Sequence, residues 1–207
     1  MKHVWKNAEK QFYLPKAKPE IVDIPKFSFF SIAGQGNPNS EFFGEYIQVL
    51  YALSYGVRMS EKGGFAPKGF FEYTVYPLEG VWDITEEAKK KGIAKLDKST
   101  LVFNLMIRQP DFVTKEFFSK IVEKTKKKKP LKLLEKAKFE TINDGKCVQM
   151  LHIGSYDNEP ASFEIMEKFA ENNDLKRISR KHREIYLSDA RKVSSDKLKT
   201  VLRFKAR

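Results

Sequence analysis

Apolar residues along the chain fall into short runs whose spacing alternates between that of a β-strand and that of an amphipathic helix. Segments that contain glycine or proline separate these runs. The first series predicts a strand at 27–34, a helix over 43–57, a strand at 70–76 and, after a turn at 77–80, an apolar segment at 81–83. A second series predicts a strand at 148–153, a helix around 163–169, and strands at 182–187 and 200–204. The order strand, helix, strand, strand therefore occurs twice.

Between the two series the pattern predicts a strand at 101–107, a helix capped by Asp111 or Thr114, and a strand at 139–142. The Asn143-Asp144-Gly145 sequence is a hairpin signal and predicts a tight turn into the second series. The whole predicts an α+β fold, built as a tandem strand-helix-strand-strand duplicate with antiparallel sheets and helices on one side.

The expected domain organisation follows from this duplication. Residues 1–25 are polar and punctuated by proline, and we expect them to form an N-terminal arm. Residues 26–207 are expected to form a single domain made of two pseudo-symmetric halves, at about 26–110 and 111–207.

One predicted strand carries a charged residue among apolar neighbours. In the segment from Lys181 to Asp189, strand alternation places His182, Glu184 and Tyr186 on one face, with Arg183 and Ile185 on the other. A carboxylate that is buried without a partner is costly. The face that carries Glu184 therefore either meets water or lines a cavity that uses its negative charge.

Composition favours a folded domain without a metal or cofactor. Hydrophobic residues make up 41% of the 207 residues, and 17 Phe and 8 Tyr indicate either an aromatic-rich core or an aromatic-lined pocket. The single cysteine, Cys147, excludes an intramolecular disulfide and a multi-cysteine zinc site. The three histidines are far apart, and Gly34-Gln35-Gly36 lacks the lysine and the spacing of a phosphate-binding loop.

The net charge of +12 raises the question of nucleic acid. Many of the lysines lie at 89–91 and 124–129, where predicted helices end and cations are favoured. Because no DNA-binding signature accompanies them, we expect a solvated basic face and no specific nucleic-acid partner. No segment has the length of a membrane span and no signal peptide is present, so a cytoplasmic location without a membrane partner is expected.

Two motifs give the chain a family resemblance. The turn Tyr76-Pro-Leu-Glu-Gly-Val-Trp-Asp83, and the segment His182-Arg-Glu-Ile-Tyr-Leu-Ser-Asp189 followed by Thr200-Val-Leu-Arg203, are similar to those of the GyrI-like small-molecule-binding family. The resemblance extends from about Pro25 to the C-terminus. It implies two strand-helix-strand-strand units side by side with a central ligand groove, and the Glu-Gly-x-Trp turn resembles the stand-alone branch of the family.

The resemblance also implies the site. Glu184 matches a strand glutamate that points into the family's pocket and faces cationic or polar groups of the ligand, and Trp82, Tyr76 and Tyr186 match its aromatic wall. Further candidate ligand contacts are Tyr55, Phe43, Glu79, Tyr156 and Phe163.

Two functions are compatible with these residues. Some stand-alone members of the family hydrolyse cyclopropane-bearing DNA-alkylating toxins. In that case we expect Glu184 to orient or deprotonate a water molecule, a phenol such as Tyr76 or Tyr186 to donate to the substrate carbonyl, and Trp82 to stack on the substrate. The alternative is a non-enzymatic protein that sequesters aromatic or cationic molecules, or that acts through a partner such as gyrase or a separate regulator. The DNA-binding half of the family's transcription activators is absent from the sequence.

Overall fold

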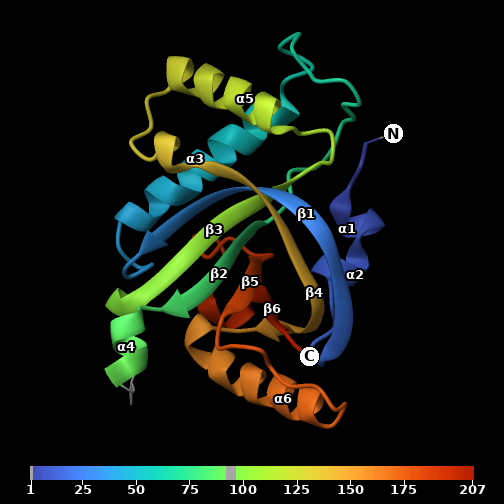
Figure 1. The fold of residues 1–207 in the computed structure, drawn as a ribbon, viewed down its shortest axis with the longest axis vertical. Coiled ribbons are helices and arrows are strands. Elements are labelled where there is room, and N and C mark those ends of the chain that lie inside the picture. The colour runs from blue at the N-terminus through green and yellow to red at the C-terminus, as the bar shows by residue number, and fades with distance from the viewer. Residues whose placement is uncertain (1, 92–96) are drawn as a thin grey trace. The chain divides into compact units, whose positions relative to one another are not determined.

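The computed structural model describes residues 2–91 and 97–207, and the chain forms two compact units. The first unit comprises Met1–Val4, Phe27–Leu78 and Trp82–Ile142, and the second comprises Trp5–Lys26, Glu79–Val81 and Asn143–Arg207. Three strands supply residues to both units: β1 (Glu20–Gln35), β2 (Leu78–Ile84) and β4 (Lys138–Ile153). Hydrogen-bonded neighbours follow the strand order β1-β3-β2-β5-β6-β4 (Figure 1).

The first unit is built around an antiparallel strand pair. β1 pairs with β3 (Leu101–Gln109) in a register that runs from Ser28 opposite Gln109 to Gln35 opposite Val102. The helix α3 (Phe42–Arg58) packs against α5 (Lys115–Lys128) and β3. Thr114 caps α5, because its side chain accepts a hydrogen bond of 3.2 Å from the backbone N–H of Phe117. This unit also contains α4 (Glu86–Lys91), η1 (Lys98–Thr100) and η2 (Leu134–Lys136).

The second unit has β6 (Lys199–Lys205) at its centre. This strand pairs antiparallel with β4 on one side and with β5 (His182–Tyr186) on the other. The helix α6 (Glu159–Glu171) packs Met166 and Ala170 into an apolar cluster with Met150 and Phe204. The remaining elements are α1 (Trp5–Ala8), α2 (Lys10–Tyr13), η3 (Tyr156–Asn158) and η4 (Ser195–Lys197). Trp5 and Tyr13 are buried, so the short N-terminal helices are packed against this unit.

The predicted α+β class with antiparallel pairing is confirmed. The helices expected from apolar spacing correspond to α3, α5 and α6, and the strands expected at 101–107, 182–187 and 200–204 correspond to β3, β5 and β6. The division into duplicated halves stays a prediction.

The strand predicted at 70–76 is wrong. This segment is irregular, and Tyr73 makes only an isolated bridge to His3. Its aromatic residues pack on Phe112 instead, with ring centroids 5.2 Å away for Phe70 and 5.1 Å away for Phe71. Aromatic content signals a strand because aromatic side chains favour pleated surfaces, but here the same side chains form a cluster. The turn predicted at 77–80 overlaps the beginning of β2.

The hairpin predicted at Asn143-Asp144-Gly145 is also wrong, because β4 runs through these residues without a break. Gly145 keeps the positive φ of 63° that its lack of a side chain allows. Asp144 pairs with Arg183 at 2.8 Å and with Lys205 at 3.0 Å. Aspartate favours turns in short peptide sequences, but Asp144 is held within a strand by cations of β5 and β6.

Arg183 lies at the centre of a buried ionic cluster in the second unit. Its guanidinium contacts Glu79 and Asp144 at 2.8 Å each, and the Arg183 and Glu79 side chains are only 4% and 2% exposed. Burial raises the pKa of Glu79, and the charges of Arg183 and Arg203 act against it. Burial acts to lower the pKa of Arg183, but Glu79 and Asp144 raise it above its ordinary value. The guanidinium therefore keeps its proton in this cluster.

Replacing Arg183 with Leu would leave Glu79 buried without its cation. We expect this to lower the free energy of unfolding by about 3–5 kcal/mol, because an uncompensated buried charge is expensive. Arg191→Leu is the matched control: Arg191 pairs with Asp189 at 2.8 Å on the surface, with its side chain 84% exposed, and should cost at most about 1 kcal/mol. Urea unfolding measures both, and equal effects would contradict a structural role for the buried cluster.

Asp144 gives this cluster a dependence on pH. Burial opposes ionisation, but Arg183 and Lys205 hold the pKa of Asp144 below its ordinary value of 3.8. A lowered carboxyl pKa stabilises the fold above the unfolded value, and this stabilisation is lost as the pH falls through the folded value. The stability difference between the unmodified protein and Asp144→Asn should therefore shrink as the pH is lowered below 3.8. A difference in urea midpoint that stays constant from neutral to acid pH would contradict this assignment.

Candidate functional site

The side chains on one face of β5 contact one another. His182 Nε2 lies 3.0 Å from Glu184 Oε1, and Tyr186 donates its hydroxyl proton to Glu184 Oε2 at 2.8 Å. Glu184 is 8% exposed. The predicted alternation along this strand is confirmed. The Glu184 carboxylate is buried and hydrogen-bonded at both oxygens. Because a carboxylate only accepts hydrogen bonds, His182 Nε2 carries the proton of the shared contact.

The beginning of α6 supplies further side chains to this face. Ser155 caps the short turn η3 and Pro160 opens α6, which is where proline is tolerated in a helix. The Phe163 ring meets the His182 ring edge-on, with centroids 4.7 Å apart. Tyr156 meets Tyr186 in the same manner at 6.1 Å. The face is referred to below as the β5–α6 site, and it consists of Tyr156, Glu159, Phe163, His182, Glu184 and Tyr186.

Two members of this site were not among the predicted site residues: His182, which was placed on the Glu184 face without a role, and Glu159. Glu159 is 6% exposed, its carboxyl group hydrogen-bonds to Glu184, and burial together with the Glu184 charge raises its pKa far above the ordinary value. The pair therefore carries a single negative charge at neutral pH. In the sequence, a glutamate before Pro160 has the pattern of a common acidic residue at the N-terminus of a helix. Only the fold shows that Glu159 contacts a residue of β5.

Burial also affects the phenol at the edge of the site. Tyr156 is 37% exposed, and its pKa is raised to about 12, first by burial and then by the charges of Glu184, Glu159 and Asp189. Its hydroxyl therefore remains protonated near neutral pH and can act as a hydrogen-bond donor.

Trp82 and Phe43 belong to an aromatic group in the first unit. Their rings stack with centroids 5.9 Å apart at 29°, and Phe103 lies 5.3 Å from Trp82. Trp82 is only 6% exposed. Within this unit the tryptophan is thus a packed side chain, and its contact with a ligand stays a prediction.

Tyr76 lies elsewhere in the first unit and is 3% exposed. Its hydroxyl is 3.3 Å from His3 Nε2, and the guanidinium of Arg108 lies over its ring at 4.6 Å. Tyr55 is 47% exposed on α3 beside Tyr51. The predicted roles of Tyr76 and Tyr55 also stay predictions.

Glu79 lies in the buried ionic cluster described above. Its Oε2 accepts a hydrogen bond of 2.8 Å from Arg183 Nη1. The carboxylate therefore already has a cation as its partner, and its contact with a ligand stays a prediction.

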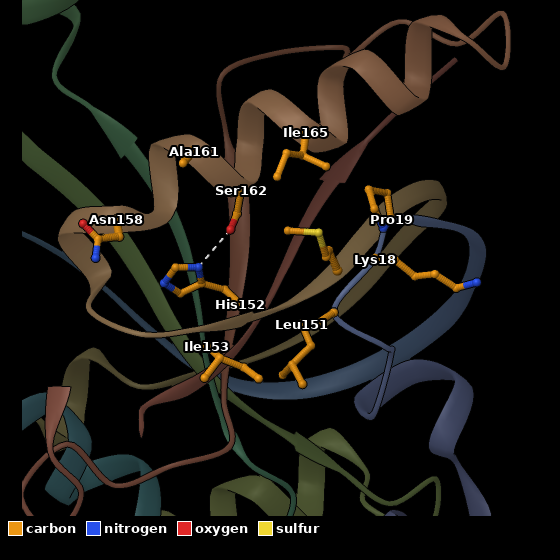
Figure 2. A pocket seen from close by; sticks show the side chains of 11 residues that line it. Lys18, Pro19, Leu151, His152, Ile153, Asn158, Ala161, Ser162 and Ile165 are labelled. Atoms are coloured by element: carbon orange, nitrogen blue, oxygen red, sulfur yellow. Dashed lines mark hydrogen bonds between the residues drawn. The ribbon is translucent and has the colours of Figure 1, made fainter. Parts of the chain in front are cut away.

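A shallow cavity of about 440 Å³ lies beside α6 in the second unit (Figure 2). Apolar side chains, including Leu151, Ile153 and Ile165, line most of it. Figure 2 shows His152 in its wall, hydrogen-bonded through Nδ1 to Ser162 at 2.9 Å. The other ring nitrogen lies 3.0 Å from the backbone carbonyl of Ser155.

These two contacts assign the tautomer of His152 and its role. A carbonyl only accepts, so Nε2–H donates to Ser155 and Nδ1 accepts from Ser162. His152 thereby joins the loop that carries Tyr156 to the helix that carries Glu159.

Among the described residues, no helix has the length and hydropathy needed to cross a bilayer.

One family model matches most of the chain. Residues 17–206 match the model of the GyrI-like small molecule binding domain. No curated protein sequence matches the chain.

Solved structures from Listeria innocua are similar over the full length. One, described as a hydrolase, is 35% identical with a TM-score of 0.90, and the alignment covers 99% of this chain and 100% of that chain. Another, described as a hydrolase encoded by lin2189, is 36% identical with the same TM-score and full coverage of both chains. The C-terminal domain of EcmrR is 13% identical with a TM-score of 0.54, over 92% of this chain and 97% of that domain, and shows the fold alone.

Removal of the Ser162 hydroxyl tests the His152 connection. We expect Ser162→Ala to lower the free energy of unfolding by about 1–3 kcal/mol, because it leaves a buried ring nitrogen without its donor. The exposed Ser119, whose hydroxyl bonds to the backbone carbonyl of Lys115, provides the control. Ser119→Ala should change stability by about 0.5 kcal/mol or less. Equal values in chemical denaturation would show that the His152 contacts contribute nothing specific.

Proposed function

The chain belongs to the GyrI-like small-molecule-binding family, and on that premise we propose that it binds aromatic or cationic molecules beside Glu184 and hydrolyses cyclopropane-bearing DNA-alkylating toxins. The observation that carries the proposal is a buried carboxylate, 8% exposed, that is held between a phenol and an imidazole. The Listeria innocua relatives described as hydrolases support the choice of reaction class.

The binding step follows from charge and aromatic surface. The carboxyl pair of Glu159 and Glu184 carries one net negative charge in a partly desolvated place, where attraction to a cation is stronger than in water. Tyr156, Tyr186 and Phe163 surround it with rings whose faces attract cations and flat apolar groups. Such a site recognises charge and flatness more than shape, which suits a range of ligands.

The chemical step uses the strain of the substrate. The oxygen of a water molecule attacks the cyclopropane carbon, the strained C–C bond breaks, and its electron pair moves into the conjugated dienone. The proton of the attacking water passes to Glu184, which returns it to solvent, and the carbonyl oxygen takes up one proton from solvent to become a phenol. A phenol of the protein stabilises the carbonyl during this step. Tyr186 donates its only hydroxyl proton to Glu184 Oε2 at 2.8 Å, so in this role it would turn that proton from Glu184 to the carbonyl. Tyr76 is the second candidate donor.

Replacing Glu184 with Gln tests this mechanism. The amide keeps the size of the side chain but does not accept a proton from water, so we expect turnover to fall by at least about 100-fold, within the range of general-base catalysis. Binding of an uncharged aromatic ligand should be retained. The measurement is chromatography of the ring-opened product after incubation with a cyclopropane-bearing alkylator, performed with chelator-treated protein.

Glu164→Gln on the exposed face of α6 provides the control. Glu164 pairs with Lys168 at 2.7 Å and is 67% exposed, so turnover should remain that of the unmodified protein. Turnover that survives in Glu184→Gln would eliminate Glu184 as the base.

Sequestration without turnover is the second candidate function, and one observation favours it. Both oxygens of Glu184 already accept hydrogen bonds, which suits a carboxylate that holds a charge for a bound cation. Ligand binding in the unmodified protein, without any ring-opened product, would support this function.

A further inference from the structure

Three side chains of metal-binding type converge in the β5–α6 site. One ligand atom each from Glu159, His182 and Glu184 lies within 4.8 Å of the other two. Glu159 comes from the start of α6, whereas His182 and Glu184 come from β5, so the group forms only when the chain folds. We propose that these residues bind a divalent transition-metal ion such as Zn²⁺, independently of the small-molecule function proposed above.

The donor set fits this class of ion. One imidazole nitrogen and two carboxylates are ligands that Zn²⁺, Fe²⁺, Mn²⁺ and Co²⁺ accept, whereas Mg²⁺ and Ca²⁺ prefer oxygen ligands alone. Three protein ligands leave coordination positions open for water or another molecule. Zn²⁺ takes ligand distances of about 2.0–2.2 Å, and three atoms within 4.8 Å of one another can reach such distances with small side-chain movements.

A second observation concerns a carboxylate oxygen without a partner. Oε1 of Glu159 is buried and has no hydrogen-bond partner among the residues that the structure describes, in a side chain that is only 6% exposed. An unsatisfied buried acceptor costs free energy, and here it belongs to a carboxyl group that touches a second carboxylate. A dication would satisfy this oxygen and would take the place of the proton that Glu159 holds against Glu184.

The hydrogen bonds of His182 also fit a ligand role. Nε2 faces Glu184 Oε1 at 3.0 Å, and a metal ion would replace the proton between them. Nδ1 is directed at the backbone carbonyl of Arg180, at 3.4 Å, which is the outer contact that a metal-bound histidine needs. The Phe163 ring fixes the orientation of the imidazole, and Tyr186 holds the second oxygen of Glu184.

The surrounding charge favours a cation. Asp157 adds to the negative charge that acts on Glu159, and Asp189 adds to the charge that acts on Tyr156. The neighbouring cation Arg183 points to the opposite face of β5 and is neutralised there by Glu79 and Asp144. The site therefore presents several negative groups, and the nearest guanidinium along the strand is already paired.

Titration of the chelator-treated protein with ZnCl₂ alone, by isothermal calorimetry, tests the proposal. We expect one Zn²⁺ per chain, and a loss of affinity of at least about tenfold in Glu159→Gln and in His182→Gln, since changes near metal ligands cost 10–100-fold. Glu164→Gln and His3→Gln are the matched controls and should bind as the unmodified protein does. Co²⁺ provides a second measurement, because its visible absorption changes when imidazole nitrogen coordinates it.

Absence of stoichiometric binding, or equal affinity in His182→Gln and His3→Gln, would overturn the proposal. The variants are first compared in urea unfolding, so that a loss of fold is recognised. Since this titration contains no organic ligand, and the toxin assay is performed without metal, each of the two proposals can fail while the other stands.

Discussion

Burial of opposite charges on the two faces of β5 is the constraint on which the second unit depends. Successive side chains of a strand point to opposite faces, so Arg183 and Glu184 are both buried yet lie in different environments. On one face the guanidinium is neutralised by two carboxylates at 2.8 Å. On the other face the carboxylate meets a phenol, an imidazole and a second carboxyl group. A shift of register by one residue would exchange these environments and leave both charges unpaired, so the ionic cluster specifies which face of β5 carries Glu184.

Local patterns in the sequence predicted part of this arrangement correctly. The alternation around Glu184 placed His182 and Tyr186 correctly, because strand geometry has a period of two whatever the strand contacts. The helices were found from apolar spacing, and Thr114 was correctly among the two candidate caps for α5. Glu159 could not be found in this way, because it is 25 residues before Glu184 and looks like a common acid at the start of a helix.

The wrong predictions have a related cause. Asn143-Asp144-Gly145 has strong turn chemistry, but the cations that hold Asp144 in β4 come from residues 183 and 205. The segment at 70–76 has the composition of a strand, yet its rings pack on Phe112, about 40 residues further along the chain. In each case a contact between distant residues overrides the local preference, as is common for strand propensity. The histidines were likewise set aside as scattered in sequence, although one of them meets two glutamates in space.

The number of hydrogen bonds that the Glu184 carboxylate already accepts bears on whether it binds a cation or takes a proton from water. A carboxylate offers about four lone-pair positions, and here Tyr186, His182 and Glu159 each use one. In the proposed hydrolysis, the remaining position would accept a water molecule and orient it for attack on the strained ring. Tyr186 and His182 fix the direction of the carboxylate, and in the proposed reaction a substrate with an already strained bond depends on the direction from which the water molecule attacks.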